Sequence, residues 1–230
     1  MGQKSDIIIY MATEDNRMVP ALPEGLVLMP QQTEQLGRFA GLVADWTVRV
    51  NLVSRREAGN LWDNHILDSL AALPALAEKP SAEVMDLGPG GGFPGIPLKI
   101  CLPSMGLTCL EATRKKARFI EMAAQELGLT GVAVVAQHSQ EAQKDKAFLG
   151  RYDFVTARAV AELKDLIKMS FPFLKVGGRL LAYKSSRAEE EIFRASAAMK
   201  KYMASLEGVM KTPAGTSEKD RRIIMVRRDG

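Results

Sequence analysis

Residues 86–95 read DLGPGGGFPG: the first two end a short segment, residues 84–87, that is typical of a buried strand, and a glycine loop follows it. Residues 94–101, after the glycines, read as a helix. Glycine lacks a Cβ atom, so such a loop can adopt positive φ angles and let the backbone approach a bound molecule closely. A glycine-rich turn between a strand and a helix therefore indicates a ligand-binding loop at the carboxyl edge of a parallel sheet.

Strands and helices alternate after this loop. Four further strands are expected before the final pair, at residues 107–111, 132–136, 154–157 and 180–183. Helices are expected at residues 113–127, 139–148, 161–174 and 188–204, with Gly177-Gly178 ending the third of them. The last two strands, 207–211 and 222–227, have no helix between them and should be antiparallel. The pattern predicts an α/β fold with a mostly parallel seven-stranded sheet, covered on both faces.

The chain before the glycine loop is expected to form a helical cap. Helical spacing of apolar residues predicts two helices, at residues 31–51 and 57–73. The first thirty residues contain three prolines and little periodicity, so we expect an irregular extension there. The predicted organisation is an extension (1–30), a helical cap (31–80) and a ligand-binding domain (81–230).

The composition is that of a globular protein. Hydrophobic residues make up 47% and charged residues 25%, which excludes a disordered or fibrous chain. No apolar run approaches the roughly 18 residues that a membrane span needs. Two cysteines cannot form a disulfide framework, so we expect a cytoplasmic protein. The net charge is +4, and the basic pairs Arg221-Arg222 and Arg227-Arg228 indicate either a nucleic-acid face or a charged strand edge.

The loop and the next strand together indicate an adenosine-containing cofactor. Glu111 ends that strand, where its carboxylate can accept hydrogen bonds from ribose hydroxyls. Residues 90–95 also fit the dinucleotide pattern G-x-G-x-x-G, so a nicotinamide oxidoreductase is one alternative. Pro94 and Pro97, however, remove backbone donors that a pyrophosphate would need. The final strand pair also suits an S-adenosylmethionine (AdoMet) methyltransferase, which we favour. A non-catalytic RNA-binding module on the same fold is the third possibility.

Four motifs, in order along the chain, give a more specific indication. They are NLVS at residues 51–54, HILDS at residues 65–69, GGGFPGIPL at residues 90–98 and Arg158-Ala159. Together they resemble the bacterial RsmG (GidB) family of small-subunit rRNA guanine-N7 methyltransferases. The resemblance implies a Rossmann-like class I methyltransferase that uses AdoMet. It implies as substrate a guanine in the 530 loop of 16S rRNA, so the partner would be this RNA or the small ribosomal subunit.

The resemblance also carries site residues over to this chain. Gly88 and Phe93 would line the AdoMet site, Ser139-Gln140 would contact the adenine, and Arg158 would lie between cofactor and substrate. The family usually has a carboxylate where Gln140 stands, although an amide can also bond an adenine edge. The complete set of expected AdoMet contacts is Asp86, Gly88, Gly90, Phe93, Glu111, Ser139, Gln140 and Arg158.

The chemistry of N7 methylation needs no general base, because guanine N7 carries a lone pair and no proton. The enzyme has to align the nucleophile with the methyl group, and Arg158 is the candidate for positioning the guanine or a phosphate. The other reading of Arg158 is an ion pair that closes the strand end. No metal site is expected, since His138, the only histidine besides His65, has no companion at ligand spacing.

Basic residues near the cofactor loop are candidates for binding RNA. Cations at a helix start oppose the helix dipole, so the cluster within residues 114–118 suits a phosphate backbone better than it suits helix stability. The other interpretation of these residues is a solvated charged face. His65 lies three residues before Asp68, and this pair either covers the cleft or forms a surface hydrogen bond that holds the cap. The predicted RNA contacts are Arg114, Lys115, Lys116, Arg118, Lys184 and His65. We expect the protein to be a monomer.

Overall fold

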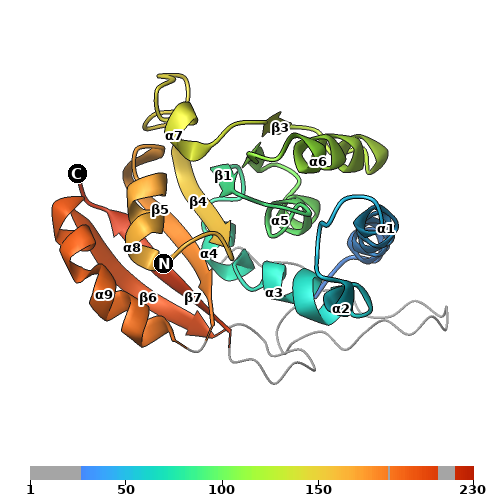
Figure 1. The fold of residues 1–230 in the computed structure, drawn as a ribbon, viewed down its shortest axis with the longest axis horizontal. Coiled ribbons are helices and arrows are strands. Elements are labelled where there is room, and N and C mark those ends of the chain that lie inside the picture. Colours follow the sequence, from blue (N-terminus) through green and yellow to red (C-terminus); the bar gives the residue numbers. More distant parts are fainter. Residues whose placement is uncertain (1–26, 186, 212–220) are drawn as a thin grey trace, which may run out of the picture.

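Seven strands form one sheet in the order β3-β2-β1-β4-β5-β7-β6. The computed structural model describes residues 27–185, 187–211 and 221–230 (Figure 1). Strands β1 to β5 pair in parallel, and β7 is antiparallel to both β5 and β6. The predicted mixed sheet is therefore confirmed. The strands are β1 (Glu83–Leu87), β2 (Gly106–Leu110), β3 (Val132–Val135), β4 (Tyr152–Arg158), β5 (Leu174–Lys184), β6 (Ala204–Lys211) and β7 (Arg222–Arg228).

Helices cover both faces of the sheet (Figure 1). Successive strand residues point to opposite faces, so Val84 joins one apolar core and Met85 joins the other. The first core packs under α1, α5 and α6, and the second packs under α8 and α9. The bounds of these helices, with the short α7, are α1 (Pro30–Thr47), α5 (Gly95–Cys101), α6 (Arg114–Glu126), α7 (Ser139–Ala142), α8 (Leu163–Ser170) and α9 (Ala188–Lys201).

The segment between α1 and β1 is more broken than expected. One helix over 57–73 is wrong, because the chain instead forms four short turns of helix there. Gly59 ends the first, and the second is a π-helix, a form that often occurs at functional sites. The four are α2 (Arg55–Ala58), η1 (Trp62–Ile66), α3 (Leu67–Leu70) and α4 (Leu73–Ala77). Residues 1–26 of the predicted irregular extension lie outside the described residues.

The predicted end of the helix before β5 is also wrong. This helix, α8, stops at Ser170, and β5 begins at Leu174 and runs through Gly177-Gly178. A Cβ atom on Gly178 would lie 2.9 Å from the carbonyl oxygen of Lys175 and 3.1 Å from that of Asp153. The glycine thus permits a close approach of backbones inside the strand, and it does not end a helix. Within the described residues, no helix is long and apolar enough to cross a membrane.

Candidate functional site

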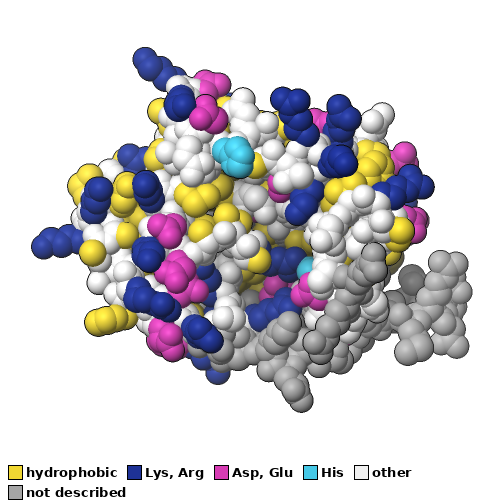
Figure 2. Space-filling model, in the orientation of Figure 1, with side chains coloured by type: hydrophobic (Ala, Val, Ile, Leu, Met, Phe, Trp, Pro, Cys, Tyr) yellow, Lys and Arg dark blue, Asp and Glu magenta, His cyan; other side chains and the backbone are white. Residues whose placement is uncertain are grey.

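A pocket of about 940 Å³ opens where β1, β4 and β5 end, against the segment that joins α1 to α3. Figure 2 shows this hollow, which holds charged side chains of both signs. Its volume is within the usual range for small-molecule and cofactor sites. Its lining consists of Asn51, Leu52, Val53, Ser54, Glu57, His65, Asp68, Gly88, Pro89, Gly90, Gly91, Phe93, Lys116, Arg158, Ala159, Tyr183, Lys184, Ser185, Glu191 and Arg221.

The glycine loop forms one wall of the pocket. Gly88, Gly90 and Gly92 have φ angles of 63°, 58° and 87°, which L-residues with a side chain rarely adopt. A Cβ atom on Gly88 would also lie 3.0 Å from Cγ2 of Val160. Both the torsion and the close packing therefore require glycine at position 88, as the sequence indicated.

Glu111 holds this loop from behind. The backbone N–H of Gly90 donates to its Oε2 at 3.0 Å, and the N–H of Thr113 donates to its Oε1 at 2.8 Å. The carboxylate is buried, so these bonds fix its orientation beside the loop. Glu111 is not among the residues that line the pocket, although each of its oxygens keeps a further lone pair to which a ribose hydroxyl can donate.

Asp86 lies in the interior behind the loop and is not among the residues that line the pocket. Its Oδ2 accepts from the N–H of Gly95 at 2.6 Å, and its Oδ1 accepts from the hydroxyl of Thr156 at 3.0 Å. Loss of solvation by burial raises the pKa of Asp86 from 3.8 to about 7, although both hydrogen bonds act in the opposite direction. Asp86 was expected to contact the cofactor, but it lies behind the loop, where it joins β1, β4 and α5.

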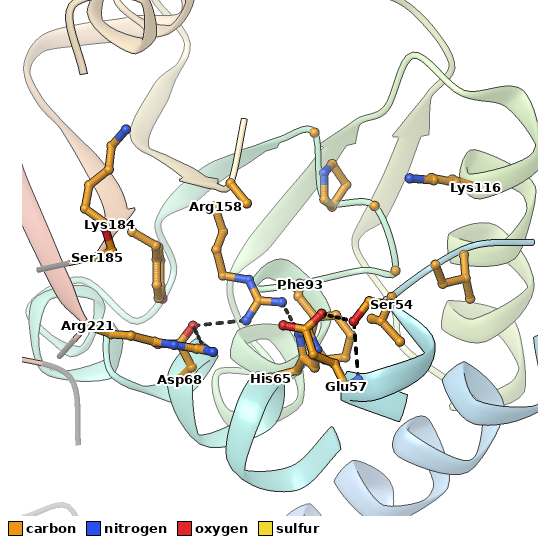
Figure 3. Close-up of a pocket in the computed structure, with 18 of the residues that line it drawn as sticks. Ser54, Glu57, His65, Asp68, Phe93, Lys116, Arg158, Lys184, Ser185 and Arg221 are labelled. Atoms are coloured by element: carbon orange, nitrogen blue, oxygen red, sulfur yellow. Dashed lines mark hydrogen bonds and ion pairs between the residues drawn. The ribbon is translucent and has the colours of Figure 1, made fainter. Parts of the chain in front are cut away.

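Arg158 occupies the middle of the pocket (Figure 3). Its Nη1 lies 3.0 Å from Oδ2 of Asp68, its Nη2 contacts Nδ1 of His65, and its guanidinium lies 5.1 Å from the centre of the Phe93 ring. The side chain is only 14% exposed, so it is held on several sides. Ala159 follows with a φ of 56°, a strained angle of the kind found at functional sites.

His65 and Asp68 are buried, and the surface hydrogen bond considered for them is therefore wrong. The ring of His65 lies 4.9 Å from that of Phe93. His65 and Asp68 both contact the guanidinium of Arg158. The pair joins the helical segment to β4 through this arginine. His65 also lines the pocket, where its ring contacts the guanidinium of Arg158.

Arg221 is a pocket residue that the sequence analysis did not identify. Its Nη1 lies 3.0 Å from Oδ2 of Asp68 and donates to the carbonyl of Asn64 at 2.6 Å. Asp68 thus has two arginine partners, one from the end of β4 and one from the residue before β7. The basic pair at 221–222 was the only local signal, and it did not indicate a partner so far away in sequence.

The basic residues predicted to bind RNA fall into different environments. Lys116 lines the pocket, while its neighbours Arg114, Lys115 and Arg118 are exposed at the start of α6. Figure 2 shows Lys and Arg side chains gathered over this helix. Lys184 lies on the other side of Arg158 in Figure 3 and forms a buried ion pair with Glu191 at 2.7 Å.

Ser139 and Gln140 do not line this pocket. Ser139 is buried at the start of α7, and Gln140 is exposed beside a second cavity of about 260 Å³ between α7 and α8. Both residues follow β3, at the same edge of the sheet as the glycine loop. Their contact with an adenine remains a prediction.

The sheet order, the antiparallel last strand and the pocket beside the glycine loop define a Rossmann-like class I methyltransferase. Solved structures share this fold. Over 77% of this chain and 65% of the other, TYW2 of P. horikoshii in complex with MeSAdo superposes with a TM-score of 0.56 at 12% identity. TYW2 of M. jannaschii in complex with AdoMet has a TM-score of 0.53 at 15% identity, over 89% of this chain and 79% of that chain.

The chain belongs to the GidB family, whose model, described as rRNA small subunit methyltransferase G, matches residues 32–223. The ribosomal RNA small subunit methyltransferase G of Streptococcus pneumoniae serotype 19F (strain G54) is 37% identical over 185 residues, 80% of this chain and 78% of that protein. The enzyme of the same name from Streptococcus sanguinis (strain SK36) is 36% identical over 177 residues, 76% and 75% of the two chains. The predicted family, enzyme class and cofactor, AdoMet, are confirmed.

Proposed function

We propose that this methyltransferase moves the methyl group of AdoMet to N7 of a guanine in the 530 loop of 16S rRNA. The observation that carries the proposal is the position of Arg158, which contacts Phe93 of the cofactor loop and Asp68 of the helical segment in one pocket. Membership of the GidB family supports the rRNA substrate. N7 needs no proton removed, so the chain's task is to bind and align the two reactants.

AdoMet supplies an activated methyl group on a sulfonium when it is bound. The residues present fit such a nucleoside, because Gly88 and Gly90 bring backbone to the pocket and the carboxylate of Glu111 lies directly behind Gly90. Ser139 and Gln140 are proposed to bond the adenine edge. Asp86 stands behind the loop and keeps it in place through Gly95.

RNA phosphates are proposed to bind at the start of α6. Arg114, Lys115 and Arg118 are exposed there, and Lys116 extends the same surface into the pocket. Lys184 and His65 are proposed to act through their neighbours, since Lys184 is paired with Glu191 and His65 contacts Arg158. We also propose a cytoplasmic monomer in which residues 31–80 cap a methyltransferase domain formed by residues 81–230.

The test uses small ribosomal subunits from a strain that lacks the enzyme. Purified protein with AdoMet should produce one guanine at which borohydride and aniline cleave the 16S rRNA. Arg158→Lys should reduce this methylation strongly, because an ammonium cannot make the same forked contacts. Arg151→Lys is the matched control, because Arg151 precedes the same strand at its far end. Binding of RNA without methyl incorporation would instead support a non-catalytic RNA-binding module.

A further inference from the structure

One carboxylate of the pocket has an oxygen atom that is not engaged. Oδ2 of Asp68 receives both arginines, Arg158 and Arg221, each at 3.0 Å. Oδ1 of the same carboxylate is buried and has no hydrogen-bond partner among the residues that the structure describes. Leaving a buried carboxylate oxygen unpaired is costly, so an atom in this position in a ligand pocket indicates a donor on the ligand.

The other carboxylates that line the pocket already have specific partners. Glu57 accepts from the hydroxyl of Ser54 at 2.7 Å. Glu191 pairs with Lys184 at 2.7 Å and accepts from the N–H of Leu163 at 2.8 Å. Asp68 is therefore the acidic side chain of the described pocket with the clearest capacity to accept from a substrate.

A guanine presents donors of the matching kind. N7 must face the methyl donor, so arginines cannot bond N7 during the reaction, and recognition has to use O6 or the opposite edge of the base. That opposite edge carries two donors, N1–H and the N2 amino group. A carboxylate can accept from both, whereas adenine offers a ring acceptor at N1 that a carboxylate repels.

We propose that Asp68 determines the choice of base by accepting hydrogen bonds from the Watson–Crick edge of the target guanine. The inference rests on the proposed function, because it assumes a guanine whose N7 is methylated. Arg158 and Arg221 hold Oδ2 and so fix the carboxylate, and Oδ1 accepts from the base. Asp68 then favours guanine and disfavours adenine at the same position.

The test compares two substrates that differ only in the N2 amino group. Small subunits are reconstituted with 16S rRNA that carries either guanosine or inosine at the target position, and kcat/KM for methyl incorporation is measured on each. The wild-type enzyme should prefer guanosine roughly tenfold or more, since inosine keeps N1–H but lacks the N2 amino group and so offers the carboxylate one hydrogen bond fewer. Asp68→Asn should methylate more slowly, and its preference should approach one. Glu57→Gln, a neighbouring pocket carboxylate, should keep the wild-type preference at whatever rate it has.

Two results would overturn the inference. One is a wild-type enzyme that methylates both subunits equally, a measurement that needs no variant to fold. The other is a slower Asp68→Asn enzyme that keeps the wild-type preference, which would make Asp68 a purely structural partner of the arginines. Titration of each variant with S-adenosylhomocysteine in a calorimeter establishes that the cofactor pocket is formed. If the wild type methylates neither subunit, the proposed function itself fails, and that outcome is distinct from both.

Discussion

Asp86 should make the stability of this protein depend on pH in an unusual direction. Burial raises the pKa of its carboxyl group in the folded chain to about 7, against 3.8 for an ordinary aspartate. Below 3.8 the group is protonated in both folded and unfolded chains, so folding has its full stability. Between the two values the folded chain holds the proton more tightly, and the free energy of unfolding falls as the pH rises.

The size of the effect follows from the separation of the two pKa values. At about 1.4 kcal/mol for each pKa unit, the loss amounts to at most about 4 kcal/mol between acidic and neutral pH. Above pH 7 the carboxylate is charged in both states and the curve should become flat. An asparagine at this position does not titrate, yet its amide can still accept from Gly95 and donate to Thr156.

The measurement is urea unfolding of the wild type and of Asp86→Asn at a series of pH values, about one pH unit apart, from about 4.5 to about 8.5. The stability of the wild type minus that of Asp86→Asn should decrease with rising pH by about 1.4 kcal/mol per unit at its steepest. Asp165→Asn, on the exposed face of α8, controls for the removal of a charge. A difference curve that is flat, or that rises with pH, would refute the reasoning about this buried carboxyl.

Three further predictions concern the pocket. Gly88→Ala should lower the free energy of unfolding and weaken the binding of S-adenosylhomocysteine, as urea unfolding and calorimetry would show. Gly128→Ala is the control: its φ is 65° and the space around it is open, so it should lose less, about 1 kcal/mol of stability. Ala159→Gly relieves the strain of a φ of 56° and should raise the free energy of unfolding by up to about 1 kcal/mol. A lower free energy of unfolding, measured by urea unfolding, would contradict this. Lys116→Gln should lower the salt dependence of RNA binding by about one phosphate contact, whereas exposed Lys146→Gln should leave it unchanged.

The sheet was predictable from the sequence because its strands are continuous apolar segments separated by glycine turns and amphipathic helices. The positive φ angles at Gly88 and Gly90 also follow from residue type, since no other residue adopts them as easily. The antiparallel pairing of the last strands follows from the absence of a helix between them. These features depend on local chemistry, which a single sequence records.

Features that depend on distant contacts were not predictable in the same way. The residue type of Gly178 is typical of a helix end, but glycine is required there by carbonyl groups of its own strand, β5, and of the neighbouring strand β4. Asp86 was expected to contact the cofactor from the end of its strand, and only the packing of α5 shows that its carboxylate is interior. Arg221 lies 153 positions from Asp68, so no pattern within either segment reveals that they meet.

The position of β7 between β5 and β6 has a consequence for biosynthesis. β7 follows β6 in the sequence and yet is an internal strand, and Arg221 before it completes the cluster around Asp68. A nascent polypeptide that has been translated only as far as β6 leaves β5 without its neighbour on that side and lacks one of the two guanidinium groups. The pocket therefore becomes whole only after β7 has been synthesised and has inserted between β5 and β6.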